Sequence, residues 1–203
     1  MHDATVTVTT RGRDGSVEEV ESDILLVATG RTPNSDTLDV AAAGIAVDPA
    51  GFVIVDDQQR TNVPGVWALG DVSSPWMLKH VANHEARIVA HNLHDPEHPS
   101  RNDRRPVPHA VFGHPQIAAV GLTEREAREG GLDVVVAVQD YAGTAYGWAM
   151  EDDTSFVKIV ADARTGRILG AHALGPQASL LIQPLISAMT FDLRAADMAR
   201  GQF

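Results

Sequence analysis

The sequence predicts a mixed α/β fold that is followed by an α+β fold. The first half begins with strand-like segments and leads into a long helical segment at residues 75–95. Residues 94–108 then contain four prolines and many charges, which indicates a boundary between domains. In the second half, strand-like segments alternate with helical ones and end in helices, an order typical of a sheet with helices packed on it.

The first half is expected to open with a ribbon of two strands at residues 4–10 and 16–22. Thr alternates with apolar residues in the first strand, as in a half-exposed strand, and Asp14-Gly15 is a hairpin signal. A continuous apolar run at 24–28 predicts a buried strand, which ends at the breaker "TGRTPN".

The rest of the first half is expected to hold a short helix, two short strands and a longer helix. Gly44 closes the short helix, since glycine adopts the conformation that ends many helices. Pro75 suits the first turn of the longer helix. These four elements are expected at residues 36–44, 51–56, 65–70 and 75–95.

Local signals define the elements of the second half. Thr123 and Glu126 have the spacing of a capping box at a helix start, and Thr165-Gly166 predicts a hairpin. Pro184 predicts a kink in an apolar helix. The expected helices lie at residues 178–191 and 194–200, and the expected strands near 107–112, 116–121, 133–140, 154–161 and 167–174.

Composition excludes several classes of function. The 203 residues carry a net charge of −11, which argues against non-specific binding of nucleic acid through its phosphates. No apolar run approaches the length of a membrane span, and the first residues alternate like a strand and do not resemble a signal peptide. The chain has no cysteine, which removes disulfides, thiolate nucleophiles and Cys-based metal sites and suits a cytoplasmic protein.

Five histidines follow one another between residues 80 and 98. His80 and His84 are four residues apart on the expected helix and therefore share a face. A site for a metal held by histidines alone is conceivable, but no carboxylate completes a known ligand pattern. We expect a solvated helix face and no metal.

Three stretches could carry a binding site. Gly30 ends an apolar run and would let a backbone or a flat ligand approach, although a plain strand and turn also explains it. Gly70-Asp71 follows another apolar run, and Asp71 could accept hydrogen bonds from ligand hydroxyls or could simply cap a turn. The helix start around Met77–His80 offers free N–H groups to an electron-rich ring or a phosphate, or is an ordinary helix cap.

Four motifs taken together resemble a known family. "ATGRTPN", "VPGVWALGDV" about 35 residues later, a helix with Leu-x-His, and "VFGHPQIAAVGLTEREA" occur in this order. They resemble the flavoprotein disulfide reductases, which include glutathione reductase, lipoamide dehydrogenase and mercuric reductase. The resemblance covers essentially the whole chain. The segments "MLKHVANHEARIVAHNL" and "DYAGTAYGWAMEDD" are most similar to members that act on the disulfide of a low-molecular-weight thiol and so serve redox homeostasis.

The resemblance implies roles for individual residues. Gly70 and Asp71 match the Gly-Asp pair whose carboxylate binds the ribityl part of FAD. The residues that match the helix start at the pyrimidine edge of the flavin are Met77, Leu78 and Lys79. Gly30 matches a glycine beside the dinucleotide of NADPH, and Ala110 a residue whose backbone approaches the nicotinamide. Arg87 matches an arginine near the disulfide substrate.

The resemblance also implies an organisation and partners. Residues 1–30 would be the closing ribbon and strand of an NAD(P)H-binding domain, and residues 31–100 the C-terminal part of an FAD-binding domain. Residues 105–203 would be a dimerisation domain. The implied partners are a second copy of the chain and a small disulfide substrate.

Several family motifs are absent from this sequence. It contains neither Gly-rich nucleotide fingerprint, no C-x₄-C redox pair and no His-Pro…Glu motif. We therefore expect the C-terminal portion of a reductase, trimmed at both ends, with no catalytic residue of its own and no activity alone. The alternative is a non-catalytic module that serves only self-association.

Overall fold

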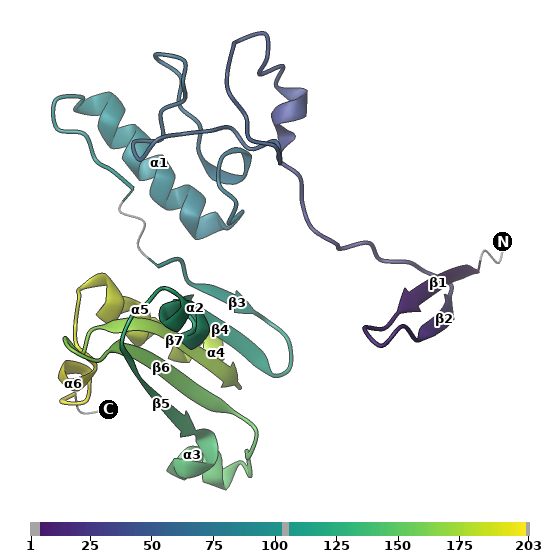
Figure 1. Ribbon diagram of the computed structural model, residues 1–203, viewed down its shortest axis with the longest axis vertical. Coiled ribbons are helices and arrows are strands. Elements are labelled where there is room, and N and C mark those ends of the chain that lie inside the picture. Colours follow the sequence, from purple (N-terminus) through teal and green to yellow (C-terminus); the bar gives the residue numbers. More distant parts are fainter. Residues whose placement is uncertain (1–4, 103–105, 202–203) are drawn as a thin grey trace.

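The chain folds into three parts, which Figure 1 shows: a two-stranded hairpin, a lobe around the long helix α1, and a lobe built on a five-stranded sheet. This computed structural model describes residues 5–102 and 106–201. Part of the expected domain boundary, residues 103–105, lies outside the described residues, as does residue 4 of the first expected strand. The mixed helix and sheet content agrees with the fold class that the sequence predicts.

The N-terminal hairpin forms as predicted. Strands β1 (Val6–Arg11) and β2 (Val17–Ser22) pair antiparallel, and the turn between them contains Asp14 and Gly15. Gly15 has a φ of 83°, a left-handed conformation that glycine adopts without steric cost. The local turn signal was therefore sufficient to define this element.

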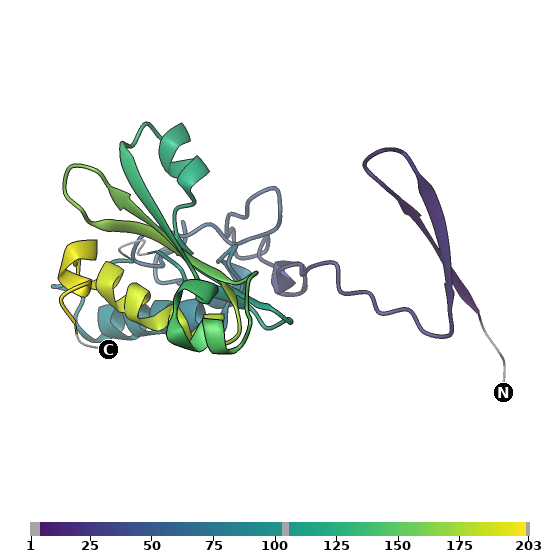
Figure 2. The ribbon, with the colours of Figure 1, turned by 90° about the horizontal axis from the view of Figure 1, so that it is seen from below.

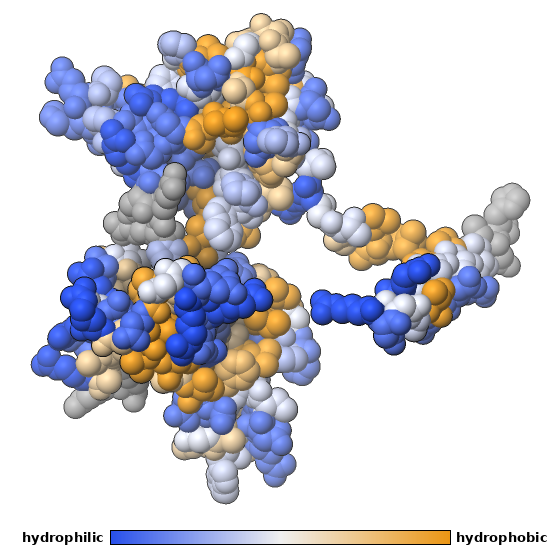
Figure 3. Space-filling view, viewed as in Figure 1, coloured by the Kyte–Doolittle hydropathy of each residue, from blue (hydrophilic) through white to orange (hydrophobic). Residues whose placement is uncertain are grey.

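An extended segment at residues 23–31 joins the hairpin to the rest of the molecule (Figure 2). The prediction of a buried strand at 24–28 is wrong, because Leu26 is 85% exposed and the segment forms no strand. A buried strand needs neighbours that satisfy its backbone, and no strand within residues 5–102 or 106–201 pairs with it. Apolar side chains of this segment face solvent, as Figure 3 shows in orange.

The prediction of a short helix at 36–44 is also wrong. The structure has a 3₁₀ helix, η1 (Asn34–Thr37), followed by consecutive turns. Asp39 has a φ of 49°, which interrupts any continuous α-helix at that point. Gly44 still closes the segment as expected, with a φ of 68° and an N–H group that donates to the Ala41 carbonyl at 3.0 Å.

The two short strands expected at 51–56 and 65–70 are reduced to single bridges. Val53 pairs with Val47, and Trp67 pairs with Arg60. Among the described residues, each segment is paired at one position and has no strand alongside it. A ladder of hydrogen bonds therefore does not form along either segment. The second segment ends in the 3₁₀ turn η2 (Gly70–Val72).

Helix α1 (Lys79–His94) begins later than expected. Pro75 is not in its first turn; it lies in a reverse turn in which the Met77 N–H group donates to the Ser74 carbonyl at 3.3 Å. Met77 then has a φ of 45° and Leu78 is extended, so neither can belong to the helix. As a result, the N-terminus of α1 lies next to η2.

The C-terminal lobe is an antiparallel sheet with the strand order β3-β4-β7-β6-β5. All five strands lie where the sequence predicts them, because their alternation and turn signals are local. Their bounds are β3 (His109–Val111), β4 (Gln116–Gly121), β5 (Val134–Asp140), β6 (Phe156–Asp162) and β7 (Ile168–Gly175).

Helices cover both faces of this sheet (Figure 2). On one face α4 (Ala178–Leu181) and α5 (Gln183–Thr190) pack on a core that includes Val120 and Ala171. On the other face α2 (Glu124–Glu129) packs through Ala127 against Val160. The remaining short helices are η3 (Tyr141–Gly143), α3 (Ala145–Ala149) and α6 (Ala195–Met198).

The helix signals of the second half are confirmed. Thr123 and Glu126 form the capping box of α2, with both reciprocal bonds present. The apolar helix is divided into α4 and α5, and Pro184 lies in the first turn of α5, where its missing N–H group costs no hydrogen bond. None of the helices in the described ranges is long and apolar enough to span a membrane.

Candidate functional site

The candidate site is the corner where η2 meets the N-terminus of α1. Gly70 has a φ of 71°, and a Cβ atom there would lie 3.3 Å from the Cβ of Ala82 in α1. A glycine therefore allows the chain to turn closely against the helix. Asp71 follows directly, and its side chain is 54% exposed, so its carboxylate can accept hydrogen bonds from a ligand.

Glu85 of α1 holds this turn from the inside. Its Oε2 atom accepts a hydrogen bond of 2.7 Å from the N–H group of Gly70, and the residue is only 4% exposed. Burial raises the pKa of Glu85 above its ordinary value, while the hydrogen bond from Gly70 partly opposes that rise. The turn and the helix are thus joined by a hydrogen bond between a backbone N–H group and a buried carboxyl oxygen.

Arg31 joins the corner from the outside. Its Nη1 atom lies 3.3 Å from Oδ2 of Asp71 and 3.4 Å from the carbonyl oxygen of Met77. It therefore links the carboxylate to the residue that leads into α1. Both charged side chains are more than half exposed, so water screens the attraction between them.

The N-terminus of α1 remains open to a ligand. Leu78 is its N-cap and provides no side-chain hydrogen bond to the first turn. The first N–H groups of a helix have no partner within the helix and carry partial positive charge. Lys79 opens the helix and adds a cation. The corner thus presents an accessible carboxylate and, close by, an uncapped helix start.

The structure places the other predicted site residues as follows. Gly30 has a φ of 129° and immediately precedes Arg31 in the chain. Arg87 lies on the exposed side of α1, and Ala110 lies in the edge strand β3, where it packs against the core of the sheet. No hydrogen bond or ion pair between described residues joins Arg87 or Ala110 to Asp71.

No group of three or more His, Asp or Glu within residues 5–102 and 106–201 could hold a metal ion. His91 and His98 instead serve the end of α1. The Nε2 atom of His91 lies 2.9 Å from the carbonyl oxygen of His98, and Nδ1 of His98 lies 3.2 Å from Oδ1 of Asp95. These contacts hold the residues that follow α1 against the end of the helix.

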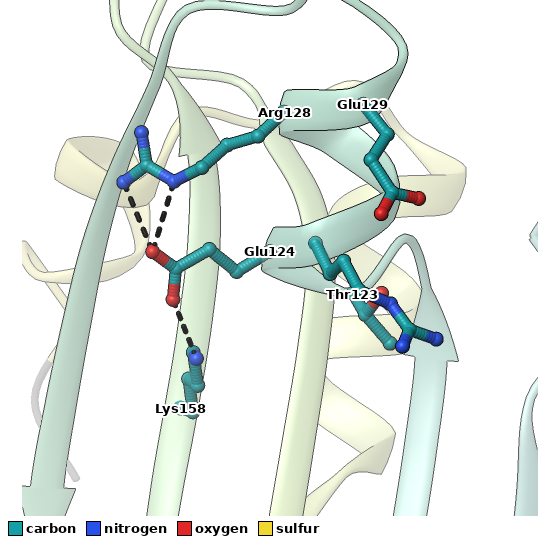
Figure 4. A pocket seen from close by; sticks show the side chains of 6 residues that line it. Thr123, Glu124, Arg128, Glu129 and Lys158 are labelled. Atoms are coloured by element: carbon teal, nitrogen blue, oxygen red, sulfur yellow. Dashed lines mark hydrogen bonds and ion pairs between the residues drawn. The ribbon is translucent and has the colours of Figure 1, made fainter.

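A second polar cluster lies on α2 and β6 (Figure 4). Glu124 forms ion pairs with Arg128 at 2.9 Å and with Lys158 at 2.7 Å, and both hydrogen bonds lower the pKa of Glu124. Since Glu124, Arg128 and Lys158 satisfy one another, they fasten α2 to the sheet. Glu129 lines the same cluster, and Figure 4 marks no interaction for it.

Sequence reasoning missed Arg31 and Glu85. Arg31 carries no signal of its own, because its partner lies far away in the chain. Glu85 does carry one, since it is a charged residue among the mostly apolar positions of the buried stripe of α1. A carboxylate at such a position needs a partner. The residues buried along this stripe are Val81, Glu85, Ile88, Val89 and Asn92.

Two family models match the chain. The family described as "Pyridine nucleotide-disulphide oxidoreductase" matches residues 2–86. Its dimerisation domain matches residues 107–203. The corner described above lies within the first match, and the five-stranded sheet lies within the second.

Individual proteins are similar over most of the chain. Mycothione reductase from Mycobacterium tuberculosis is 58% identical over 188 residues, which are 91% of this chain and 41% of that protein. Dihydrolipoyl dehydrogenase from Mycobacterium leprae is 38% identical over 189 residues, which are 93% of this chain and 40% of that protein. The chain therefore spans less than half the length of these curated relatives.

Solved structures agree with these relatives. The HOCl-induced flavoprotein disulfide reductase RclA from Escherichia coli superposes with a TM-score of 0.82 at 29% identity, covering 97% of this chain and 45% of that one. The family is FAD-dependent and uses NAD(P)H, and this chain contains only part of each cofactor site. With its two domain matches in this order, the chain belongs to the pyridine nucleotide-disulphide oxidoreductases, the flavoprotein disulfide reductases.

Proposed function

We propose that the chain is the C-terminal portion of an NADPH-dependent FAD flavoprotein that reduces a mycothione-like disulfide of a small thiol. The observation that carries this proposal is the corner in which Asp71 and the uncapped start of α1 are held together by Arg31 and Glu85. The 58% identity to mycothione reductase supports the choice of substrate class.

The residues fit one edge of a flavin. Asp71 would accept hydrogen bonds from ribityl hydroxyls, since its carboxylate is exposed. Met77, Leu78 and Lys79, where α1 begins, would face the pyrimidine edge. The positive end of a helix favours the negative charge of a reduced flavin there. FAD would supply the electron transfer to the disulfide, and these residues would bind and orient it.

The remaining predicted roles are part of the same proposal. Gly30 and Ala110 would lie beside the nicotinamide dinucleotide, and Arg87 beside the disulfide substrate. Residues 1–30 would close the NAD(P)H-binding domain, and residues 31–100 would complete the FAD-binding domain. The protein would act in the cytoplasm.

Residues 105–203 would form a homodimer. The match to a dimerisation domain supports this, as do large apolar side chains left exposed in the described part of this lobe. These side chains include Val111, Phe112, Leu180, Leu181 and Phe191. Exposed apolar patches of this kind mark interaction surfaces. Sedimentation at micromolar concentration is expected to show a dimer, and a monomer alone would contradict the proposal.

Flavin binding tests the corner directly. FAD is titrated into the purified chain while flavin fluorescence and absorbance near 450 nm are recorded. We expect weak, saturable binding that Asp71→Asn weakens, since the amide removes the negative charge. Asp36→Asn, the same change at an exposed aspartate of η1 (Asn34–Thr37), is the matched control. Equal binding by all three proteins would contradict a role for Asp71.

We further propose that the 203 residues alone do not reduce disulfides. The sequence contains no cysteine, and disulfide exchange needs a thiolate. Oxidation of NADPH in the presence of mycothione is expected to equal the rate without enzyme. Turnover above this blank would refute the proposal.

The second candidate function is a non-catalytic module for self-association, which the dimerisation domain favours. Flavin absorbance separates the two candidates. A dimer that takes up no FAD would support the module, and a dimer with Asp71-dependent FAD binding would support the reductase.

A further inference from the structure

We propose that Glu85 is a positioning residue of the flavin corner, which fixes Gly70 and Asp71 relative to the N-terminus of α1. This inference rests on the proposed function, because it concerns the same site. It assigns a role to a residue that would not touch the cofactor itself.

The geometry shows how Glu85 acts on the turn. Its carboxylate accepts the N–H group of Gly70 at 2.7 Å, and this N–H opens the 3₁₀ turn η2, where no helical partner exists for it. The carbonyl oxygen of Gly70 accepts the N–H groups of Ser73 at 3.0 Å and Ser74 at 2.8 Å. Both backbone polar groups of Gly70 are therefore held, and Asp71 follows in the same turn.

Ser74 adds a second connection on the same side. It is 4% exposed, and its hydroxyl lies close enough to the Glu85 carboxyl to lower the pKa of that group. Its carbonyl oxygen accepts the N–H group of Met77 at 3.3 Å. The chain between Gly70 and the start of α1 therefore lies against the Glu85 carboxyl group at two points, Gly70 and Ser74.

The choice of residue type supports a role beyond packing. The neighbours of Glu85 on the buried stripe include Val81 and Ile88, so an apolar side chain would cost less to bury. The nearby charges are Asp71, which opposes the ionised form of Glu85, and His84, which favours it. A carboxyl group that is buried beside apolar neighbours needs a specific hydrogen-bond partner. The partner of Glu85 is the backbone N–H group of Gly70 in the flavin corner.

The experiment compares three variants of the full chain. Glu85→Ala removes the acceptor, and Glu85→Gln keeps an oxygen acceptor without the charge. Asn92→Ala is the matched control, because Asn92 is also buried on α1 and also accepts a backbone N–H group, that of Ser100 at 2.6 Å. It serves the other end of the helix, away from Asp71.

Two readouts separate positioning from general stability. The first is hydrogen exchange at the Gly70 amide, measured by NMR without flavin. In Glu85→Ala we expect exchange at this amide to accelerate at least tenfold more than the change in global stability explains. Protection of the amide should be largely retained in Glu85→Gln and unaffected in Asn92→Ala. Equal exchange in Glu85→Ala and Asn92→Ala would overturn the proposal.

The second readout is the dissociation constant for FAD. We expect about a tenfold increase for Glu85→Ala, a smaller one for Glu85→Gln and less than twofold for Asn92→Ala, as loss of a hydrogen bond to a charged group implies. An unchanged constant in Glu85→Ala would overturn the proposal. If no variant and no parent protein binds FAD, the proposed function fails, and the exchange data alone decide whether Glu85 fixes the turn.

Discussion

The Nη1 atom of Arg31 lies 3.3 Å from Oδ2 of Asp71, although 40 residues separate them in the chain. The same nitrogen lies 3.4 Å from the carbonyl oxygen of Met77. One exposed side chain therefore connects the end of the extended N-terminal segment with both halves of the candidate flavin corner.

Arg31→Ala is expected to lower the free energy of unfolding by less than about 1 kcal/mol, because both partners of the ion pair are largely exposed. Arg31→Lys, which keeps the charge, should cost less. Urea unfolding measures both. The difference should shrink in 1 M salt, which screens exposed charges. A loss of several kcal/mol would show that the pair is not screened.

Glu85→Gln is expected to change how stability depends on pH. The folded protein raises the pKa of Glu85 above its value of 4.5, so the folded state binds the proton more tightly than the unfolded state. The stabilisation from this group is complete below pH 4.5 and is lost as pH rises through the raised pKa. The parent protein should therefore lose stability relative to Glu85→Gln over this interval. Denaturant midpoints at pH 4 and pH 7 test it, and a constant difference would contradict it.

Thr123→Ala is expected to destabilise the C-terminal lobe by about 1 kcal/mol, because it removes the side-chain oxygen that caps α2. Thr123→Ser keeps this oxygen and serves as the control. Thermal unfolding followed by circular dichroism measures both. Equal loss in the two variants would mean that the methyl group, and not the cap, stabilises the helix start.

Gly170→Ala is expected to prevent the sheet from folding correctly. A Cβ atom at Gly170 in β7 would collide with the backbone carbonyl of Leu122, which cannot move aside without disturbing the neighbouring strand. Gly113→Ala is the control, since its Cβ would meet only the Pro115 carbonyl at an ordinary 3.4 Å. Soluble yield and melting temperature should fall in the first variant alone. A Gly170→Ala protein with parental stability would show that Leu122 can shift.

The sequence predicted the second half better than the first, for a physical reason. Hairpins such as that at Thr165-Gly166, the capping box of Thr123 and the break at Pro184 depend on residues a few positions apart. These signals do not need the rest of the fold. All five strands of the sheet therefore lie near their expected positions.

The first half failed where its elements depend on distant partners. The apolar run at 24–28 has no strand beside it among the described residues, so a hydrophobic pattern alone did not produce a buried strand. The start of α1 moved because Met77 adopts a left-handed conformation that no composition rule predicts. Asp71 was found from the sequence, but its partner Arg31 was not, since only the folded chain brings the two together.

The extended segment at 23–31 also affects how the molecule scatters X-rays. It holds the hairpin well away from the two lobes, as Figures 1 and 2 both show. A compact chain of this length would have a radius of gyration of about 17 Å. The mass of the hairpin, placed far from the centre, raises that value and gives the pair-distance distribution a long tail, which deletion of the hairpin would abolish.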